Sequence, residues 1–141
     1  MKEYRFEDLE IGMSESFTVE ITEKMVNDFL CDIDDTNPLH TDSKFAKEQG
    51  YQDRVVYGML TNALLSKLVG VYLPGKYCLL QGVESEFKKP VYIGDVLTVT
   101  GTVEELHPSV KRMSVKAVIT NQNNKKVVRS KIEVGFLKYG E

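Results

Sequence analysis

Residues 59–75 read MLTNALLSKLVGVYLPG and divide the chain into two parts of different character. Between positions 59 and 69 only Lys67 carries a charge. A helix that is apolar nearly all round is buried on most of its sides. Gly70 and the Leu-Pro-Gly sequence at the end of the stretch stop the helix. The pattern therefore predicts a buried central helix against which the rest of the chain packs.

Strand-like segments follow this helix to the end of the chain. β-Branched residues recur in near alternation, and turn sequences such as NQNNKK separate the segments, which are residues 76–91, 96–106, 110–122 and 125–139. Consecutive strands joined by short turns form an antiparallel meander. We therefore predict an α+β fold in which a curved antiparallel sheet of four long strands wraps around the helix. Gly82 predicts an irregularity in the first strand.

The part before the central helix predicts a strand and a helix. Residues 16–21 are strand-like, and Thr22 is a good N-cap. Helical residues are expected from 23 to 32, because one helix face is formed by the apolar side chains of Val26, Phe29, Leu30 and Ile33. Pro38 disfavours helical geometry in the residue before it, so this helix ends before the TNPLH sequence.

A second short helix is expected shortly afterwards. Thr41 or Asp42 caps its start, and Phe45 and Ala46 face inward. Gly50 closes it in the left-handed conformation.

Composition excludes several classes of function. The 141 residues suit one domain spanning 1–141, and 18 basic against 21 acidic residues give a net charge of −3. This balance lacks the basic excess that nucleic-acid binding requires. No apolar run is long enough to span a membrane, and no signal peptide precedes the domain, which predicts a cytoplasmic protein. Cys31 and Cys78 show no metal-ligand spacing, and their apolar surroundings predict buried free thiols.

Residues 35–42, DTNPLHTD, allow two interpretations. They are good turn formers, and a single histidine after a turn is often only a hydrogen-bonded structural residue. However, the cluster lies between apolar helices, and Asn37 and Pro38 restrict the backbone that joins Asp35 to His40. A carboxylate beside an imidazole can hold a water molecule and move protons near neutral pH. The second interpretation is therefore a site that adds or removes water.

Gly58 stands at the start of the central helix and also has two interpretations. It is either a tight helix entry or a donor to a developing oxyanion, because glycine permits close approach and the helix start carries positive dipole charge.

Taken together, these motifs resemble the MaoC-like family of (R)-specific enoyl-CoA hydratases and 3-hydroxyacyl-CoA dehydratases. The core pattern D-x-N-P-[apolar]-H-x-[DE] is filled by residues 35–42. It is followed in order by GML at 58–60, LPG at 73–75 and F-K-x-P-V-x-x-G-D at 87–95. The resemblance extends from about residue 22 to residue 95, and the later strands are compatible with it.

The resemblance implies a hot-dog fold, a homodimer or dimer of dimers, and reversible hydration of a trans-2-enoyl-CoA to an (R)-3-hydroxyacyl-CoA. It implies no metal and no cofactor beyond the coenzyme A of the acyl-CoA substrate. By resemblance, Asp35 and His40 form the catalytic pair and the Gly58 amide is the oxyanion donor. Substrate contacts are expected from Asn37, Tyr57, Met59 and Asn62. Which member of the pair removes the proton stays open.

Two departures and two alternatives accompany this interpretation. The family usually has a small residue and a glycine where Ile33 and Asp34 stand, and often a histidine in place of Tyr57. An acyl-CoA thioesterase of this fold is one alternative, although the central helix lacks the carboxylate that such enzymes usually carry. A non-catalytic acyl-CoA-binding domain is the other. The side chains expected to set the depth of the acyl pocket are Leu64, Leu65, Leu68, Val71 and Tyr72, and His107 is assigned no role.

Overall fold

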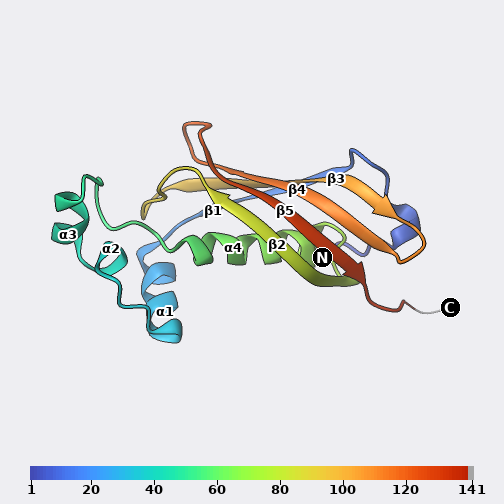
Figure 1. The fold of residues 1–141 in the computed structure, drawn as a ribbon, viewed down its shortest axis with the longest axis horizontal. Coiled ribbons are helices and arrows are strands. Elements are labelled where there is room, and N and C mark those ends of the chain that lie inside the picture. The colour runs from blue at the N-terminus through green and yellow to red at the C-terminus, as the bar shows by residue number, and fades with distance from the viewer. Residues whose placement is uncertain (140–141) are drawn as a thin grey trace.

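Helix α4 (Gly58–Lys67) lies along one face of a five-stranded antiparallel sheet, as Figure 1 shows for a computed structural model that describes residues 1–139. The five-residue π-helix η2 (Leu68–Tyr72) continues it. Leu64, Leu65 and Leu68 of this helical segment are buried in the main apolar cluster. The opposing sheet face contributes Leu97, Val99, Val103, Met113, Val115, Ile119, Ile132 and Val134. The α+β prediction of a sheet packed on a central helix is confirmed, and the arrangement is that of a hot-dog fold.

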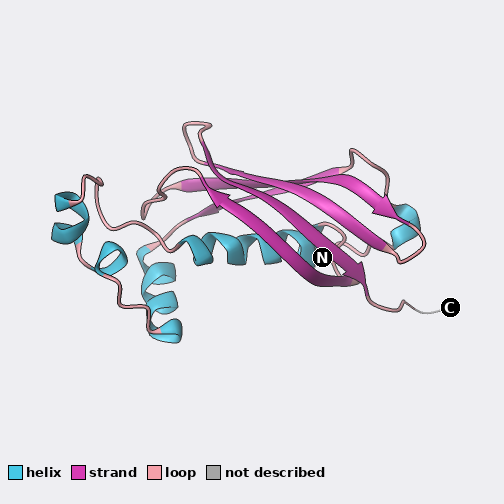
Figure 2. Ribbon diagram, viewed as in Figure 1, coloured by secondary structure: helices cyan, strands magenta, loops and turns pink. Residues whose placement is uncertain are grey.

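The sheet contains β1 (Ser14–Glu20), β2 (Cys78–Phe87), β3 (Val96–His107), β4 (Arg112–Thr120) and β5 (Lys126–Phe136). Their spatial order is β1-β3-β4-β5-β2, and every neighbouring pair is antiparallel. The five strands form one curved layer in Figure 2. The register between β2 and β5 shifts between Leu80 and Gly82, which confirms the irregularity predicted at Gly82.

The prediction of a single four-strand meander is wrong at β2. Strands β3, β4 and β5 do form a meander, but β2 pairs with β5 and lies at the sheet edge. The segment after β2 makes hydrogen bonds away from β3: the Val56 amide donates to the Val91 carbonyl at 2.8 Å, and the Gly94 amide donates to the Ile21 carbonyl at 2.7 Å. These bonds carry the chain across the end of the sheet instead of back along β2.

Three helices lie beyond that end of the sheet, near the start of α4 (Figure 1). Helix α1 (Glu23–Ile33) confirms the predicted helix, and the Thr22 hydroxyl accepts a hydrogen bond from the Met25 amide at 3.2 Å. Of the predicted apolar face only Val26 is fully buried, and Ile33 is 60% exposed. The reason is that α1 does not pack on the sheet, so part of its apolar face stays exposed.

Two short helices follow. Helix α2 (Pro38–Thr41) was not predicted, since the sequence there indicated a turn; Pro38 instead starts a single helical turn. Helix α3 (Ser43–Glu48) confirms the second predicted helix, with the Asp42 side chain as its cap. Gly50 has a φ of +93°, as expected for the end of a helix.

Two predictions about burial need correction. Cys31 is exposed because it lies on an outer face of α1 that nothing in the described chain covers, and Cys78 is only partly buried because it starts the edge strand β2. Helix α4 is also less buried than predicted, since Met59, Ala63 and Ser66 are exposed where burial on most sides of the helix was expected. The sheet covers one side of the helix only. Within the described residues there is no helix long and apolar enough to cross a membrane.

Candidate active site

A cavity of about 580 Å³ opens where the start of α4 meets α1, α2 and the end of β2. Its wall contains Asp35, His40 and Gly58, the three residues predicted to carry the chemistry. Tyr57 and Met59, two of the predicted substrate contacts, line it as well. The fold thus brings together segments that lie about twenty residues apart in the sequence.

Asp35 is held in place by one hydrogen bond to its carboxylate and one to its backbone carbonyl. The residue before it, Asp34, has a left-handed φ of 58° that ends α1. The Asp35 carboxylate accepts a hydrogen bond from the Asn37 amide at 3.2 Å, and the Asp35 carbonyl accepts one from the Tyr57 hydroxyl at 2.7 Å. A carboxylate on a loop that is fixed in this way keeps one position relative to the cavity.

Asn37 has a structural role. Its side-chain oxygen accepts a hydrogen bond from the Leu39 amide at 2.9 Å, which caps α2. Neither Asn37 nor Asn62, the other two predicted substrate contacts, belongs to the cavity wall. Asn62 donates to the sulfur of Met59 at 3.6 Å, and its side-chain oxygen is buried without a partner among the described residues.

His40 has a defined tautomer. Its Nδ1 lies 2.6 Å from the carbonyl oxygen of Val55. Because a carbonyl only accepts hydrogen bonds, Nδ1 carries the hydrogen and Nε2 of the neutral ring keeps its lone pair. The backbone of His40 is fixed too, since the Nε of Arg54 donates to its carbonyl at 2.8 Å. In the neutral form of His40, Nε2 is therefore the ring nitrogen that can accept a proton.

Gly58 is the first residue of α4, and Tyr57 before it provides no side-chain cap. The first amides of a helix have no acceptor within the helix. No other described residue accepts from the amides of Gly58 or Met59. These amides and the positive end of the helix dipole can therefore bind an oxygen that carries negative charge. A side chain at position 58 would crowd this place, since an added Cβ would lie 3.0 Å from the ring of Phe87.

The rest of the cavity wall is largely apolar, which suits an acyl chain. It is formed by Phe29, Ile33, Val56, Phe87, Val91 and Val128, with Lys88 and Lys89 also on the wall. The helix side chains predicted to set the pocket depth, Leu64, Leu65, Leu68, Val71 and Tyr72, are all absent from it. That prediction is wrong because residues 64, 65 and 68 pack into the core under the sheet. The available signal in the sequence was an apolar residue directly beside the motif, since Ile33 lies two positions before Asp35 and lines the cavity.

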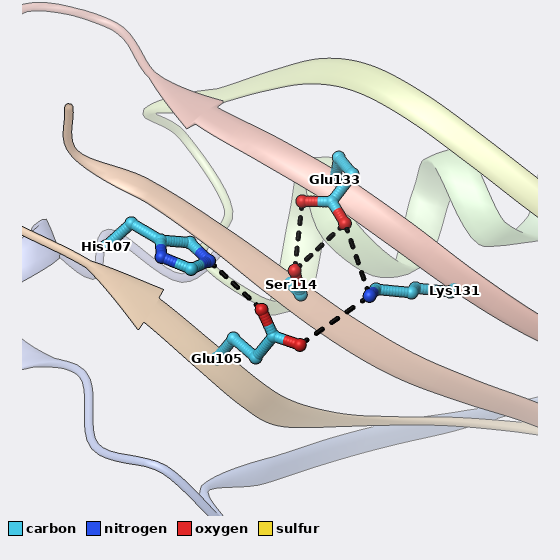
Figure 3. Close-up of polar contacts among 5 residues, drawn as sticks. All are labelled: Glu105, His107, Ser114, Lys131 and Glu133. Carbon is cyan, nitrogen blue, oxygen red and sulfur yellow. Dashed lines mark hydrogen bonds and ion pairs between the residues drawn. The ribbon is translucent and has the colours of Figure 1, made fainter.

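A second polar cluster lies far from this cavity, on β3, β4 and β5 (Figure 3). Glu105 contacts His107 at 3.1 Å and Lys131 at 3.6 Å. The Ser114 hydroxyl donates to the Glu133 carboxylate at 2.9 Å. The side chains of Glu105, His107 and Lys131 are 44–50% exposed, and such surface pairs contribute little. No group of three or more potential metal ligands occurs in residues 1–139.

Comparison with known proteins identifies the family. Residues 8–127 match the family model described as a MaoC like domain. The chain belongs to the MaoC-like domain family. It is 34% identical over 115 residues to the (R)-specific enoyl-CoA hydratase of Rhodospirillum rubrum, covering 82% of this chain and 80% of that protein. It is 36% identical over 107 residues to the 3-hydroxybutyryl-CoA dehydratase of Methylorubrum extorquens, covering 76% and 68%.

Solved structures of two R-hydratases agree with this fold. The R-hydratase PhaJ1 from Pseudomonas aeruginosa superposes with a TM-score of 0.87 at 30% identity, covering 95% of this chain and 86% of that one. The (R)-hydratase from A. caviae involved in PHA biosynthesis gives a TM-score of 0.86 at 31% identity, covering 92% and 98%.

Proposed function

We propose that this protein is a hydro-lyase that adds water reversibly to a trans-2-enoyl-CoA and forms an (R)-3-hydroxyacyl-CoA. The observation that carries the proposal is the common cavity of Asp35, His40 and the start of α4 at Gly58. Named relatives with (R)-specific hydratase and 3-hydroxybutyryl-CoA dehydratase activity support it.

The geometry provides for the two proton movements of the reaction. The Asp35 carboxylate and the free Nε2 of His40 are both acceptors on the cavity wall, so they can hold one water between them. The hydroxyl of that water bonds to C3 of the enoyl group. The released proton passes to the pair, and the pair supplies one proton to C2. One water is consumed, and both side chains return to their starting protonation states.

The start of α4 stabilises the charge that develops in between. Attack at C3 moves electrons toward the thioester oxygen, which becomes enolate-like. The amide of Gly58 has no acceptor among the described residues and lies at the positive end of the helix dipole. Preorganised amide donors of this kind contribute roughly 100- to 1000-fold in rate. No metal or organic cofactor is needed for these steps, and we expect a chelator to leave the rate unchanged.

The first experiment measures hydration of crotonyl-CoA by the loss of enoyl absorbance, with chiral analysis of the product. We expect wild-type activity, and loss of that activity in Asp35→Asn with an unchanged circular dichroism spectrum. Release of free coenzyme A thiol would instead indicate a thioesterase. Binding of crotonyl-CoA without either reaction would indicate a non-catalytic acyl-CoA-binding domain.

We further propose that the protein is a homodimer that pairs through β2. This strand is at the sheet edge, and within residues 1–139 β5 is its only neighbour in the sheet. Unpaired edge groups and exposed apolar side chains favour pairing with another chain. On β2 these side chains are Leu79, Leu80, Val83 and Phe87. The exposed face of α4 that begins at Met59 would be covered by the same partner.

The dimer is tested by sedimentation velocity. We expect a dimer for the wild type and a monomer for Val83→Lys, because Val83 is already 37% exposed and the change disturbs no core packing. Val110→Lys is the matched control, since Val110 is an exposed valine in the turn after β3. A monomeric wild type, or dimers in both variants, would contradict the proposal.

We place the protein in the cytoplasm, whose reducing conditions suit its two free cysteines.

A further inference from the structure

Residues 54–58 hold the loop of residues 35–40 in place through hydrogen bonds. The Val55 amide donates to the Leu39 carbonyl at 3.0 Å, and the Val55 carbonyl accepts from Nδ1 of His40 at 2.6 Å. Arg54 donates to the His40 carbonyl at 2.8 Å. All three bonds hold the His40 end of the loop. Asp35, at the other end of the loop, receives only one hydrogen bond from this segment in the described structure, and Tyr57 donates it.

Tyr57 contacts both members of the proposed catalytic pair. Its hydroxyl donates to the Asp35 carbonyl at 2.7 Å, and its ring centroid lies 4.2 Å from that of His40 at an interplanar angle of 32°. Phe29 packs 4.8 Å from the same ring. Tyr57 is only 2% exposed, so its own position is fixed by packing. It also directly precedes Gly58, the proposed oxyanion donor.

We propose that Tyr57 is a positioning residue that sets the placement of Asp35 relative to His40, and this proposal rests on the hydratase function proposed above. The hydroxyl bond fixes the peptide that carries the Asp35 carboxylate. The ring forms a flat wall against which the His40 imidazole lies while Nδ1 is bonded to Val55. The Tyr57 side chain thereby fixes Asp35 and His40 relative to each other, and its backbone leads directly into Gly58.

The phenol is suited to this role because it stays protonated. Burial, and to a smaller extent the negative charge of Asp35, raise the pKa of Tyr57 above its ordinary value. The hydroxyl therefore remains a donor throughout the pH range in which an imidazole base works. Loss of the donor frees the Asp35 peptide to shift, and displacement of a reacting group by about 1 Å can cost on the order of 100-fold in rate.

The test compares Tyr57→Phe with Tyr4→Phe in crotonyl-CoA hydration. Tyr4 is the matched control, because its half-buried hydroxyl donates to Glu15 at 2.8 Å and Tyr4 is not part of the cavity wall. We expect Tyr57→Phe to lower kcat by roughly 10- to 100-fold. KM should stay within about twofold, since the ring that lines the cavity is kept. Tyr4→Phe should leave both constants unchanged, although it too removes one hydroxyl hydrogen bond.

The outcomes separate the two proposals. An active wild type with equal kcat in both variants would overturn the positioning role alone, as would a loss that falls on KM and not on kcat. A wild type that does not hydrate enoyl-CoA would overturn the hydratase function and the positioning role together.

A second test covers the case in which Tyr57→Phe does not fold. 3-Fluorotyrosine at position 57 keeps the ring and the hydroxyl but ionises at lower pH than tyrosine. Once ionised, it no longer donates to the Asp35 carbonyl. We expect kcat of the substituted protein to fall at alkaline pH relative to wild type at the same pH. Identical profiles for the two proteins at a pH where phenolate absorbance shows that the substituted residue has ionised would overturn the proposal.

Discussion

His40 lies on the wall of an apolar cavity, with Nδ1 bonded to a carbonyl and its ring against Tyr57. His107 lies at the end of β3, where its side chain is 50% exposed and pairs with Glu105 in the surface cluster of Figure 3. Both are the same side chain with the same ordinary chemistry. At position 40 the tautomer, the orientation and the access to a ligand are all fixed. At position 107 water competes for every contact. The surroundings of a residue, more than its type, decide what it can do, and further pairs in this chain extend the comparison.

The largest expected effect separates the two histidines. His40→Gln should lower kcat/KM for crotonyl-CoA by about 100- to 10,000-fold, the range for a lost general acid or base. His107→Gln should stay within about twofold of wild type, because an exposed ion pair contributes little. Initial-rate kinetics on both folded variants provide the measurement. Equal losses would break the distinction between the two positions.

The two cysteines should differ in their rate of alkylation. Cys31 is exposed, while burial raises the pKa of the Cys78 thiol to about 11. The thiolate is the reactive form, and a pKa two units above an ordinary thiol leaves about 100-fold less of it at neutral pH. Iodoacetamide should therefore label Cys31 first, and labelling of Cys78 should accelerate as the pH rises toward 11. Mass spectrometry of timed samples follows both sites, and simultaneous labelling at pH 7 would contradict the raised pKa of the Cys78 thiol.

Two glycines, Gly58 and Gly82, allow the same comparison with the addition of a single methyl group. An added Cβ at Gly58 would lie 3.0 Å from Phe87 in the cavity, whereas at Gly82 it would meet Glu133 at an ordinary 3.6 Å. Gly58→Ala should lower kcat/KM about tenfold by crowding the proposed oxyanion site. Gly82→Ala should leave activity unchanged, and both should alter the free energy of unfolding by less than about 1 kcal/mol. Initial-rate kinetics measure kcat/KM, and thermal unfolding measures the stability of both variants. Full activity of Gly58→Ala would mean that the substrate oxygen binds elsewhere.

The smallest effect concerns the two lysines on the cavity wall. Lys88 forms an ion pair with Glu86, while Lys89 has no ion pair among the described residues. Lys89 is therefore better placed to attract the phosphates of coenzyme A. Lys89→Gln should raise KM about two- to fivefold at low salt and less at high salt, as for any exposed charge. Lys88→Gln should have the smaller effect, and the reverse order would show that the Glu86 pair opens during binding.

Local signals explain why much of the chain could be predicted. Thr22 and Asp42 cap helices through their own side chains, and Gly50 ends α3 because it adopts a positive φ at low cost. The alternation in β3, β4 and β5 predicts strands because one face of each is buried in the core. These are interactions between residues a few positions apart, so the order of residues alone carries them.

Long-range contacts explain what could not be predicted. The place of β2 beside β5 depends on pairing between residues far apart in the sequence, such as Val83 with Ile132, which no local pattern encodes. The exposed face of α4 follows from the sheet covering only one of its sides, although the sequence there is apolar nearly all round. The prediction of the cavity lining failed for the same reason, since Phe87 reaches the site only because β2 ends there.

The sequence by itself determined the helix caps, the strands, the apolar helix and the motif that contains Asp35 and His40. Only the tertiary structure decided that Gly58 and Tyr57 meet that motif, that Nε2 of His40 is left free, and that one tyrosine touches both members of the pair. The physical reason is distance along the chain. Caps and periodicity arise from neighbours within one or two turns, whereas the tautomer of His40 is set by a carbonyl fifteen residues away that folding alone brings within 2.6 Å.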